Sequence, residues 1–115
     1  MHEISLVQGL LQQLAELAGK HRSKSISKVK VEVGPLSGIV VDSFRFGFEV
    51  LAAEKELTKQ AVLEIVIPPS RYKCCYCGHV DVNGANMPDA CPQCSHTLLV
   101  PEGGDGLILL QVEME

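Results

Sequence analysis

The sequence contains no long hydrophobic run and no leader-like segment. Its longest apolar stretches, residues 39–41 and 107–110, are far shorter than the roughly 20 residues that cross a bilayer. The start, Met1-His2-Glu3, lacks the basic and apolar blocks of a signal peptide. These absences predict a soluble, cytoplasmic protein without membrane contacts, whose cysteines are in a reducing compartment and free to bind metal.

An excess of basic residues is also missing. The chain has 14 Asp and Glu against 10 Lys and Arg, a formal net charge of -4. Within residues 71–101, where all the cysteines lie, Arg71 and Lys73 are balanced by Asp81 and Asp89. Because nucleic-acid binding depends on Lys and Arg at the phosphates, this balance predicts that nucleic acid is not a partner.

Catalytic motifs are lacking as well. The sequence shows no nucleophile–base pair and no Walker loop, and the glycines at 103, 104 and 106 do not form a phosphate loop. The five cysteines are an odd number, which argues against a closed disulfide framework. We therefore expect a protein that is not an enzyme.

The hydrophobic pattern predicts two helices and three strands. Apolar residues recur every three or four positions over residues 3–20, as in an amphipathic helix. Residues 26–34 alternate between valine and charge, as in a strand with one wet face. A second helix, capped by Asp42 or Ser43, carries the phenylalanines, and we interpret its aromatic stripe as core. Residues 61–67 and 107–114 complete an α+β fold, a small antiparallel sheet packed with two helices.

The segment 71–101 has a different composition. It holds every cysteine and both tyrosines, and about thirty residues bury too little apolar surface to fold unaided. We expect it to be an inserted subdomain, resembling a zinc ribbon and held by a site of four cysteines. Pro68-Pro69 and Gly103-Gly104 would be its hinges, and residues 1–70 with 102–115 would form the main domain.

Four cysteines form two C-x-x-C knuckles, Cys74/Cys77 and Cys91/Cys94, separated by thirteen residues. Each knuckle can point two sulfurs inward from one tight turn, and two knuckles supply a tetrahedral thiolate cage. Because four thiolates leave no open coordination position, we predict structural Zn(II).

Some details of this site remain open at the sequence level. Iron is accepted by the same knuckles. Cys75 is either a spare thiol or a substitute ligand, and the spacing favours Cys74 with Cys77. His79 and His96 each lie two residues after the second cysteine of a knuckle. There an imidazole could donate a hydrogen bond to a sulfur, replace a cysteine as zinc ligand or be solvated.

The amino terminus offers a second set of metal donors. His2 is either a solvated terminal residue or a ligand. The Met1 amine, the His2 amide nitrogen and the His2 imidazole can close adjacent chelate rings, a planar nitrogen set that suits Ni(II) or Cu(II). Glu3 could complete the set with its backbone nitrogen or its carboxylate.

Taken together, these features resemble the HypA/HybF family of hydrogenase nickel-incorporation proteins. The resemblance covers essentially the whole chain, and it rests on the M-H-E start, the V-G-P-L-S sequence at 33–37, the two cysteine knuckles and the V-E-M-E end at 112–115.

The resemblance implies a nickel metallochaperone. By family analogy His2 is the principal Ni(II) ligand with Met1 and Glu3 beside it, and the four knuckle cysteines hold zinc. It also implies a GTPase partner of the HypB type and delivery of nickel to the large subunit of [NiFe]-hydrogenase. Some relatives serve urease, and a homodimer is compatible with the sequence. The alternative is a zinc-ribbon interaction or regulatory module without nickel function, in which His2 is incidental.

Overall fold

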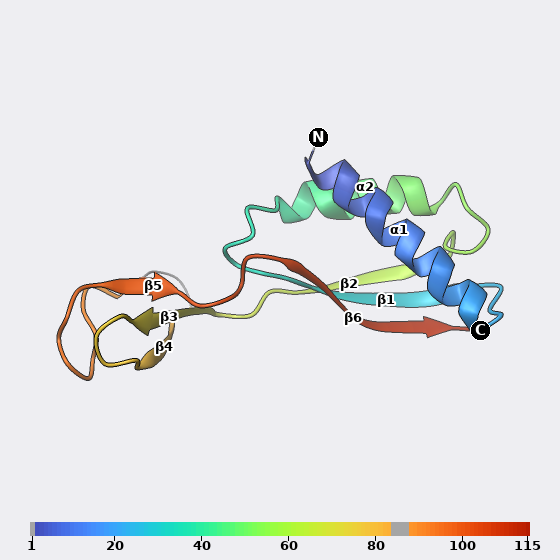
Figure 1. Cartoon of the computed structure of the whole chain (residues 1–115). Coiled ribbons are helices and arrows are strands. Elements are labelled where there is room, and N and C mark those ends of the chain that lie inside the picture. Colours follow the sequence, from blue (N-terminus) through green and yellow to red (C-terminus); the bar gives the residue numbers. More distant parts are fainter. Residues whose placement is uncertain (1, 84–87) are drawn as a thin grey trace. The chain divides into compact units, whose positions relative to one another are not determined.

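The structure is a computed structural model that describes residues 2–83 and 88–115 (Figure 1). Its elements, in chain order, are α1 (His2–Lys20), β1 (Ile26–Val33), α2 (Val41–Ala52), β2 (Val62–Val66), β3 (Ser70–Cys74), β4 (Val80–Asn83), β5 (Leu99–Pro101) and β6 (Leu107–Met114). No described helix is both long and apolar enough to span a membrane. The α+β class predicted from the sequence is confirmed.

The chain divides into two compact units. The larger unit comprises residues 1–32, 39–66 and 108–115, and the smaller one residues 33–38 and 67–107. The sequence predicts that residues 1–70 with 102–115 bind nickel and that the inserted residues 71–101 bind zinc. This division into a nickel-binding domain and a zinc-binding subdomain stays a prediction.

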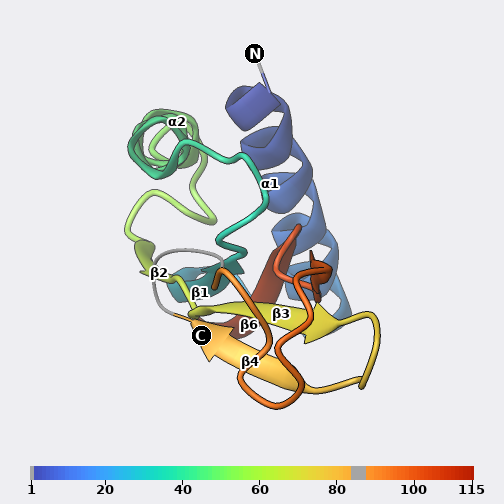
Figure 2. The same cartoon turned by 90° about the vertical axis from the view of Figure 1, so that its left-hand side faces the viewer.

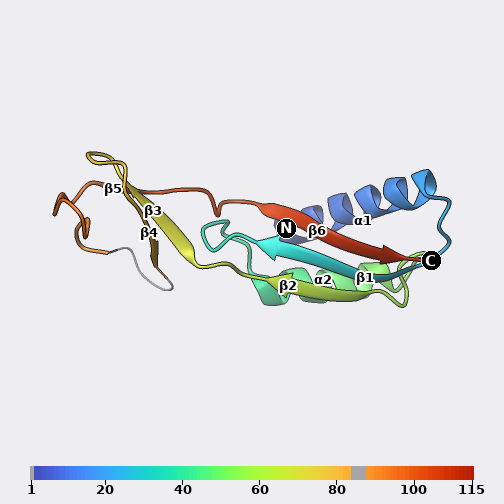
Figure 3. The same cartoon turned by 90° about the horizontal axis from the view of Figure 1, so that it is seen from below.

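In the larger unit two helices cover one face of a three-stranded sheet with the order β2-β1-β6 (Figures 2 and 3). The alternating valines of β1 and the apolar stripe of α1 point into the space between the layers, because a strand and an amphipathic helix each bury one side. The fully buried side chains include Val7, Leu14, Val29, Phe44 and Phe48, so the aromatic stripe of α2 is core, as the sequence indicated.

The prediction of an all-antiparallel sheet is wrong for one strand pair. β1 and β2 run parallel, with Val29 opposite Leu63 and Val31 opposite Ile65. The reason is the helix between them: α2 carries the chain back along the sheet, so the next strand starts at the same end as the previous one.

The predicted cap of the second helix is also wrong. The N-cap of α2 is Val40, whose side chain makes no capping hydrogen bond, and the helix ends at Ala52. The helix already includes Val41, which precedes Asp42 and Ser43. Neither polar residue is therefore the N-cap.

The smaller unit contains an antiparallel sheet with the order β4-β3-β5. Residues 33–38 lie against the stretch that leads into β6: the Gly34 amide donates to the Gly106 carbonyl at 2.9 Å, and the Leu36 amide donates to the Gly104 carbonyl at 2.7 Å. A Cβ at Gly34 would collide with the Gly104 carbonyl, and Gly104 itself has a φ of +71°. This close backbone approach requires glycine at position 34 and favours it at 104.

Candidate metal centre

The two cysteine knuckles fold in the same way. In the first, the Gly78 amide donates to the Cys74 carbonyl and the Cys74 amide to the His79 carbonyl. In the second, the Ser95 amide donates to the Cys91 carbonyl and the Cys91 amide to the His96 carbonyl, and all four distances lie between 2.8 and 3.0 Å.

The residue after each knuckle has a left-handed backbone conformation. Gly78 has a φ of +79° and Ser95 has a φ of +67°. Each left-handed residue turns the chain back on itself. The knuckle is thereby a closed loop with both cysteine side chains on its inner side.

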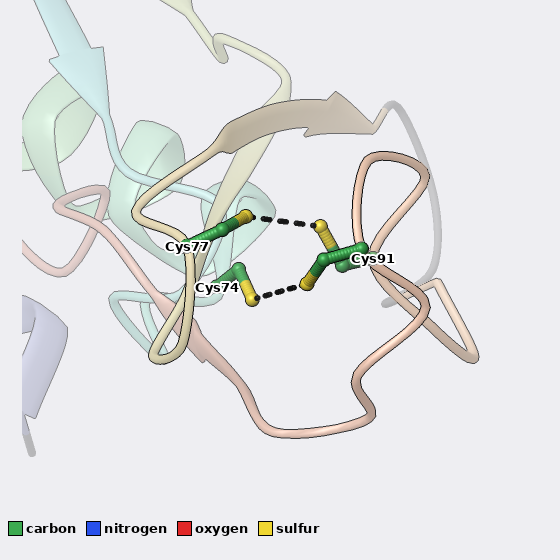
Figure 4. A group of neighbouring side chains, drawn as sticks. Cys74, Cys77 and Cys91 are labelled. Carbon is green, nitrogen blue, oxygen red and sulfur yellow. Dashed lines mark hydrogen bonds between the residues drawn. The ribbon is translucent and has the colours of Figure 1, made fainter.

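The four knuckle sulfurs converge on one point. All four Sγ atoms lie within 4.8 Å of one another, and both Cys74–Cys94 and Cys77–Cys91 are separated by 3.6 Å (Figure 4). A tetrahedral zinc with Zn–S bonds of about 2.3 Å requires sulfurs about 3.8 Å apart, whereas a disulfide requires about 2.05 Å. The arrangement therefore suits one tetrahedral metal ion and contains no disulfide.

Backbone amides point at two of the sulfurs. The Tyr76 amide donates to Cys74 Sγ and the Gln93 amide to Cys91 Sγ, each at 3.4 Å. These bonds stabilise thiolate charge, since an N–H group favours the ionised form of its acceptor. In each knuckle, the sulfur of the first cysteine thus accepts a hydrogen bond from the amide two positions later.

The pKa values of the cysteine thiols differ, because backbone amides, burial and the neighbouring sulfurs act on each thiol to a different extent. Backbone amide hydrogen bonds lower the pKa of Cys74 to about 6, and the amide of Cys77 makes the largest contribution. For Cys94, the His96 amide lowers the pKa, but burial and the three neighbouring sulfurs outweigh it and raise the pKa to about 12. Without a cation the cluster favours the thiolate of Cys74 and keeps the proton on Cys94, whereas a divalent metal requires every ligand to be deprotonated.

This difference predicts how zinc binding depends on pH. The pKa of Cys77 is also raised, because the lowering effect of the His79 amide is outweighed by burial and by the Cys91 sulfur. The protons that Zn(II) must displace at pH 7 therefore include those of Cys77 and Cys94. Below about pH 6, Cys74 is protonated too, so one more proton must leave. We expect zinc affinity to fall as the pH falls, and more steeply below pH 6.

Calorimetric titration in two buffers of different ionisation enthalpy counts the protons that zinc binding releases. The count should rise from pH 7 to pH 5.5 as Cys74 gains its proton. A count that does not rise over this range contradicts the assignment of the acidic thiol to Cys74.

The core around the site is small. It consists of Tyr72, Cys74, Cys91 and Leu99, with the half-buried Cys94 packed against it. Half of the buried residues in this core are therefore cysteines. A hydrophobic core of this size contributes little to the stability of the smaller unit. The unit therefore needs metal coordination to stay folded.

The other residues considered from the sequence lie outside the sulfur cluster. Cys75 is exposed, and its amide donates to the Leu98 carbonyl at 3.0 Å. His79 and His96 contribute their backbone carbonyls to the knuckles, as described above. The His96 ring is stacked on Tyr76, with centroids 3.8 Å apart and an interplanar angle of 12°.

The Tyr76–His96 stack joins a residue of one knuckle to a residue just after the other. Sequence reasoning did not find it. The only sequence signal is an aromatic residue inside one knuckle and a histidine beyond the second.

The predicted nickel ligands lie at the start of α1. Met1 lies outside the described residues, and His2 is the first residue of α1, with a side chain that is also outside them. The Glu3 carboxylate accepts a hydrogen bond from the Val40 amide at 3.2 Å. The nickel set of Met1, His2 and Glu3 therefore remains a prediction.

Comparisons with known proteins cover the whole length of the chain. Residues 1–114 match the family described as "Hydrogenase/urease nickel incorporation, metallochaperone, hypA". The chain is 38% identical over 115 residues to a hydrogenase maturation factor HypA from Azotobacter chroococcum, with all of both chains covered. It is 40% identical over 116 residues to the corresponding protein of Azotobacter vinelandii, again over both full lengths.

Solved structures are also similar. The solution structure of the Ni metallochaperone HypA from Helicobacter pylori matches with a TM-score of 0.70 at 29% identity, covering 97% of this chain and 96% of the other. A second solution structure of a HypA protein matches with a TM-score of 0.78 at 30% identity, covering 100% and 97% of the two chains. From the family match and these full-length relatives, the chain belongs to the HypA family of hydrogenase/urease nickel-incorporation metallochaperones, a non-catalytic family.

Proposed function

We propose that this protein binds Ni(II) at its amino terminus and delivers it to the large subunit of [NiFe]-hydrogenase during maturation. The observation that carries the proposal is the match of residues 1–114 to a nickel-incorporation family. The relatives it resembles over their full lengths are named hydrogenase maturation factors. Delivery of nickel to urease is a further role that the family description includes.

Nickel would be held by the Met1 amine, the His2 amide and imidazole nitrogens, and Glu3 through its backbone nitrogen, since the Glu3 carboxylate accepts the Val40 amide. The position of His2 at the first residue of α1 supports this set. The first amides of a helix have no acceptor within the helix, so coordination by an amide nitrogen here breaks no helical hydrogen bond.

Zinc would be held by Cys74, Cys77, Cys91 and Cys94, and the sulfur geometry supports this choice. Its role in this proposal is structural, since four thiolates fill a tetrahedral shell and leave no position for water or nickel. The larger unit would then carry the nickel site and the smaller unit the zinc site.

The proposed partners are a nickel-handling GTPase of the HypB type and the hydrogenase large subunit, and the proposed location is the cytoplasm. Family membership supports hydrogenase maturation as their common process. Homodimer formation belongs to the same proposal, and light scattering of the purified protein tests it.

Replacement of His2 tests the nickel proposal directly. His2→Ala removes the imidazole, and we expect nickel affinity to fall by more than about 100-fold, because even changes around a metal's ligands cost 10–100-fold. Zinc content should be unchanged. Cells that carry only His2→Ala should contain folded protein but immature hydrogenase, with partial rescue by excess nickel through mass action.

His21→Ala is a matched control, because His21 is an exposed histidine just after the other end of α1. In a nickel titration, this variant should have the same nickel affinity as the wild type. If instead His2→Ala binds nickel as the wild type does, the alternative function, a zinc-ribbon interaction module, becomes the better account.

A further inference from the structure

The carboxylate of Glu3 connects the first turn of α1 to the start of α2. It accepts a hydrogen bond from the Val40 amide at 3.2 Å, across a sequence separation of 37 residues. Val40 is the N-cap of α2, and its carbonyl accepts the first hydrogen bond of that helix, from Phe44, at 2.9 Å. Glu3 therefore contacts α2 at its N-cap residue.

This contact supplies what the sequence of α2 lacks. In a capping box, a glutamate at the third helical position accepts a hydrogen bond from the N-cap amide of its own helix. In α2 that position is Ser43, and the N-cap Val40 makes no side-chain capping bond. The carboxylate of Glu3 takes the place of the missing glutamate from a different helix, and its negative charge is favourable at the positive end of α2.

An apolar contact fixes the same turn of α1 next to this bond. Gly47 is a buried residue of α2, and a Cβ placed on it would lie 2.9 Å from Ile4 Cδ1 and 3.4 Å from Val7 Cγ2. The absence of a side chain at Gly47 lets Ile4 pack onto the backbone of α2. Residues 3 and 4 thus attach the beginning of α1 to α2 through one polar and one apolar contact.

We propose that Glu3 is a positioning residue for nickel binding, and that it acts through the hydrogen bond to Val40. This inference rests on the proposed nickel function. The donors proposed for nickel are the Met1 amine, the His2 nitrogens and the Glu3 backbone nitrogen, at a chain end that would otherwise fray. Tying residue 3 to α2 limits the conformations of these donors before the metal arrives, which lowers the entropy cost of chelation.

The proposal assigns different consequences to two substitutions. Glu3→Gln keeps a carbonyl oxygen that can accept the Val40 amide, whereas Glu3→Ala removes the acceptor. We expect Glu3→Gln to bind nickel within about threefold of the wild type and Glu3→Ala to bind about tenfold more weakly, the size expected when the backbone of about one further residue must be ordered on binding. The nickel absorption spectrum should be unchanged in both variants, because the carboxylate holds the chain rather than the metal.

The hydrogen bond can be tested without nickel. In amide NMR spectra of the full-length zinc-loaded protein, the Val40 resonance should shift and its hydrogen exchange should accelerate in Glu3→Ala but much less in Glu3→Gln. Glu16→Ala is the matched control: it removes an exposed carboxylate from the same helix with the same change of charge, and it should leave Val40 and nickel affinity unchanged.

Three results would overturn the inference while leaving the proposed function intact. One is a Val40 resonance that does not respond to Glu3→Ala. Another is a changed nickel spectrum in Glu3→Gln, which would make the carboxylate a ligand. The third is nickel affinity in Glu3→Ala equal to that of the wild type. Failure of the proposed function is a separate outcome, detected by His2→Ala binding nickel normally.

Discussion

Serine at Cys91 is expected to release zinc and to unfold the smaller unit while the larger unit stays folded. Cys91 is 2% exposed, its Sγ lies 3.6 Å from that of Cys77, and it accepts the Gln93 amide. A hydroxyl in its place is a poor zinc ligand and leaves three sulfurs for a tetrahedral ion. The metal contributes roughly 10–16 kcal/mol in small zinc-dependent units, far more than a core of four residues can replace.

The larger unit should survive because its core is independent of the cysteines. Val7, Leu14, Val29, Phe44 and Phe48 are buried between its helices and its sheet. In amide NMR spectra, the resonances of residues 70–74 and 99–101 should collapse toward random-coil positions, while those of α1 and β1 keep their dispersion. Elemental analysis should find one zinc per chain in the wild type and none in Cys91→Ser.

Cys75 provides the matched control for this experiment. It is the exposed cysteine next to Cys74, and it lies outside the sulfur cluster. Cys75→Ser should keep one zinc per chain and a folded smaller unit. Loss of zinc from Cys75→Ser, or iron in the purified wild type, contradicts the proposed site.

The cysteine site was predictable from the sequence because its information is local. The spacing Cys74-x-x-Cys77 constrains two sulfurs within one turn, and the same holds for Cys91 and Cys94, so four ligands follow from two short motifs. The helix α1 and the strand β6 were predictable for a similar reason, since their hydrophobic periods extend over many residues.

The parallel pairing of β1 with β2 was not predictable from those patterns. Alternation at Val29 and Val31 shows that one face of the strand is buried, but it carries no information about the direction of the neighbouring strand. Direction depends on the path of α2 between the two strands, which is a property of the connection. A strand–helix–strand order was visible in the sequence, and it is the signal that favours parallel pairing.

The contact between Glu3 and Val40 was hidden for a different reason. Capping rules describe side chains within a few residues of a helix start, and the residue that bonds this N-cap lies 37 positions away. A valine at the N-cap without a local polar partner is the only sequence sign that another segment supplies the bond.

Four glycines added before Met1 are expected to remove high-affinity nickel binding although every side chain of the protein remains. The proposed donor at the chain end is the α-amine of Met1, and a preceding residue converts this amine into a peptide nitrogen, which binds a metal only after losing its amide proton. We expect affinity to fall by about 100-fold, comparable to large changes at metal sites but smaller than the effect of His2→Ala. The zinc content and the Val40 amide resonance should not change, because the cysteines and Glu3 are untouched.

The same chemistry sets the pH dependence of nickel binding and the control for the extension. The amine and the imidazole bind nickel only when neutral, and their ordinary pKa values are about 7.7–8.0 and 6.5, so affinity should fall as the pH decreases through this range. Four glycines added after Glu115 should leave nickel binding intact, since that end carries none of the proposed donors. If four glycines before Met1 are as harmless in isothermal titration as four after Glu115, the amine is not a ligand, and nickel must be held by donors that the extension does not alter.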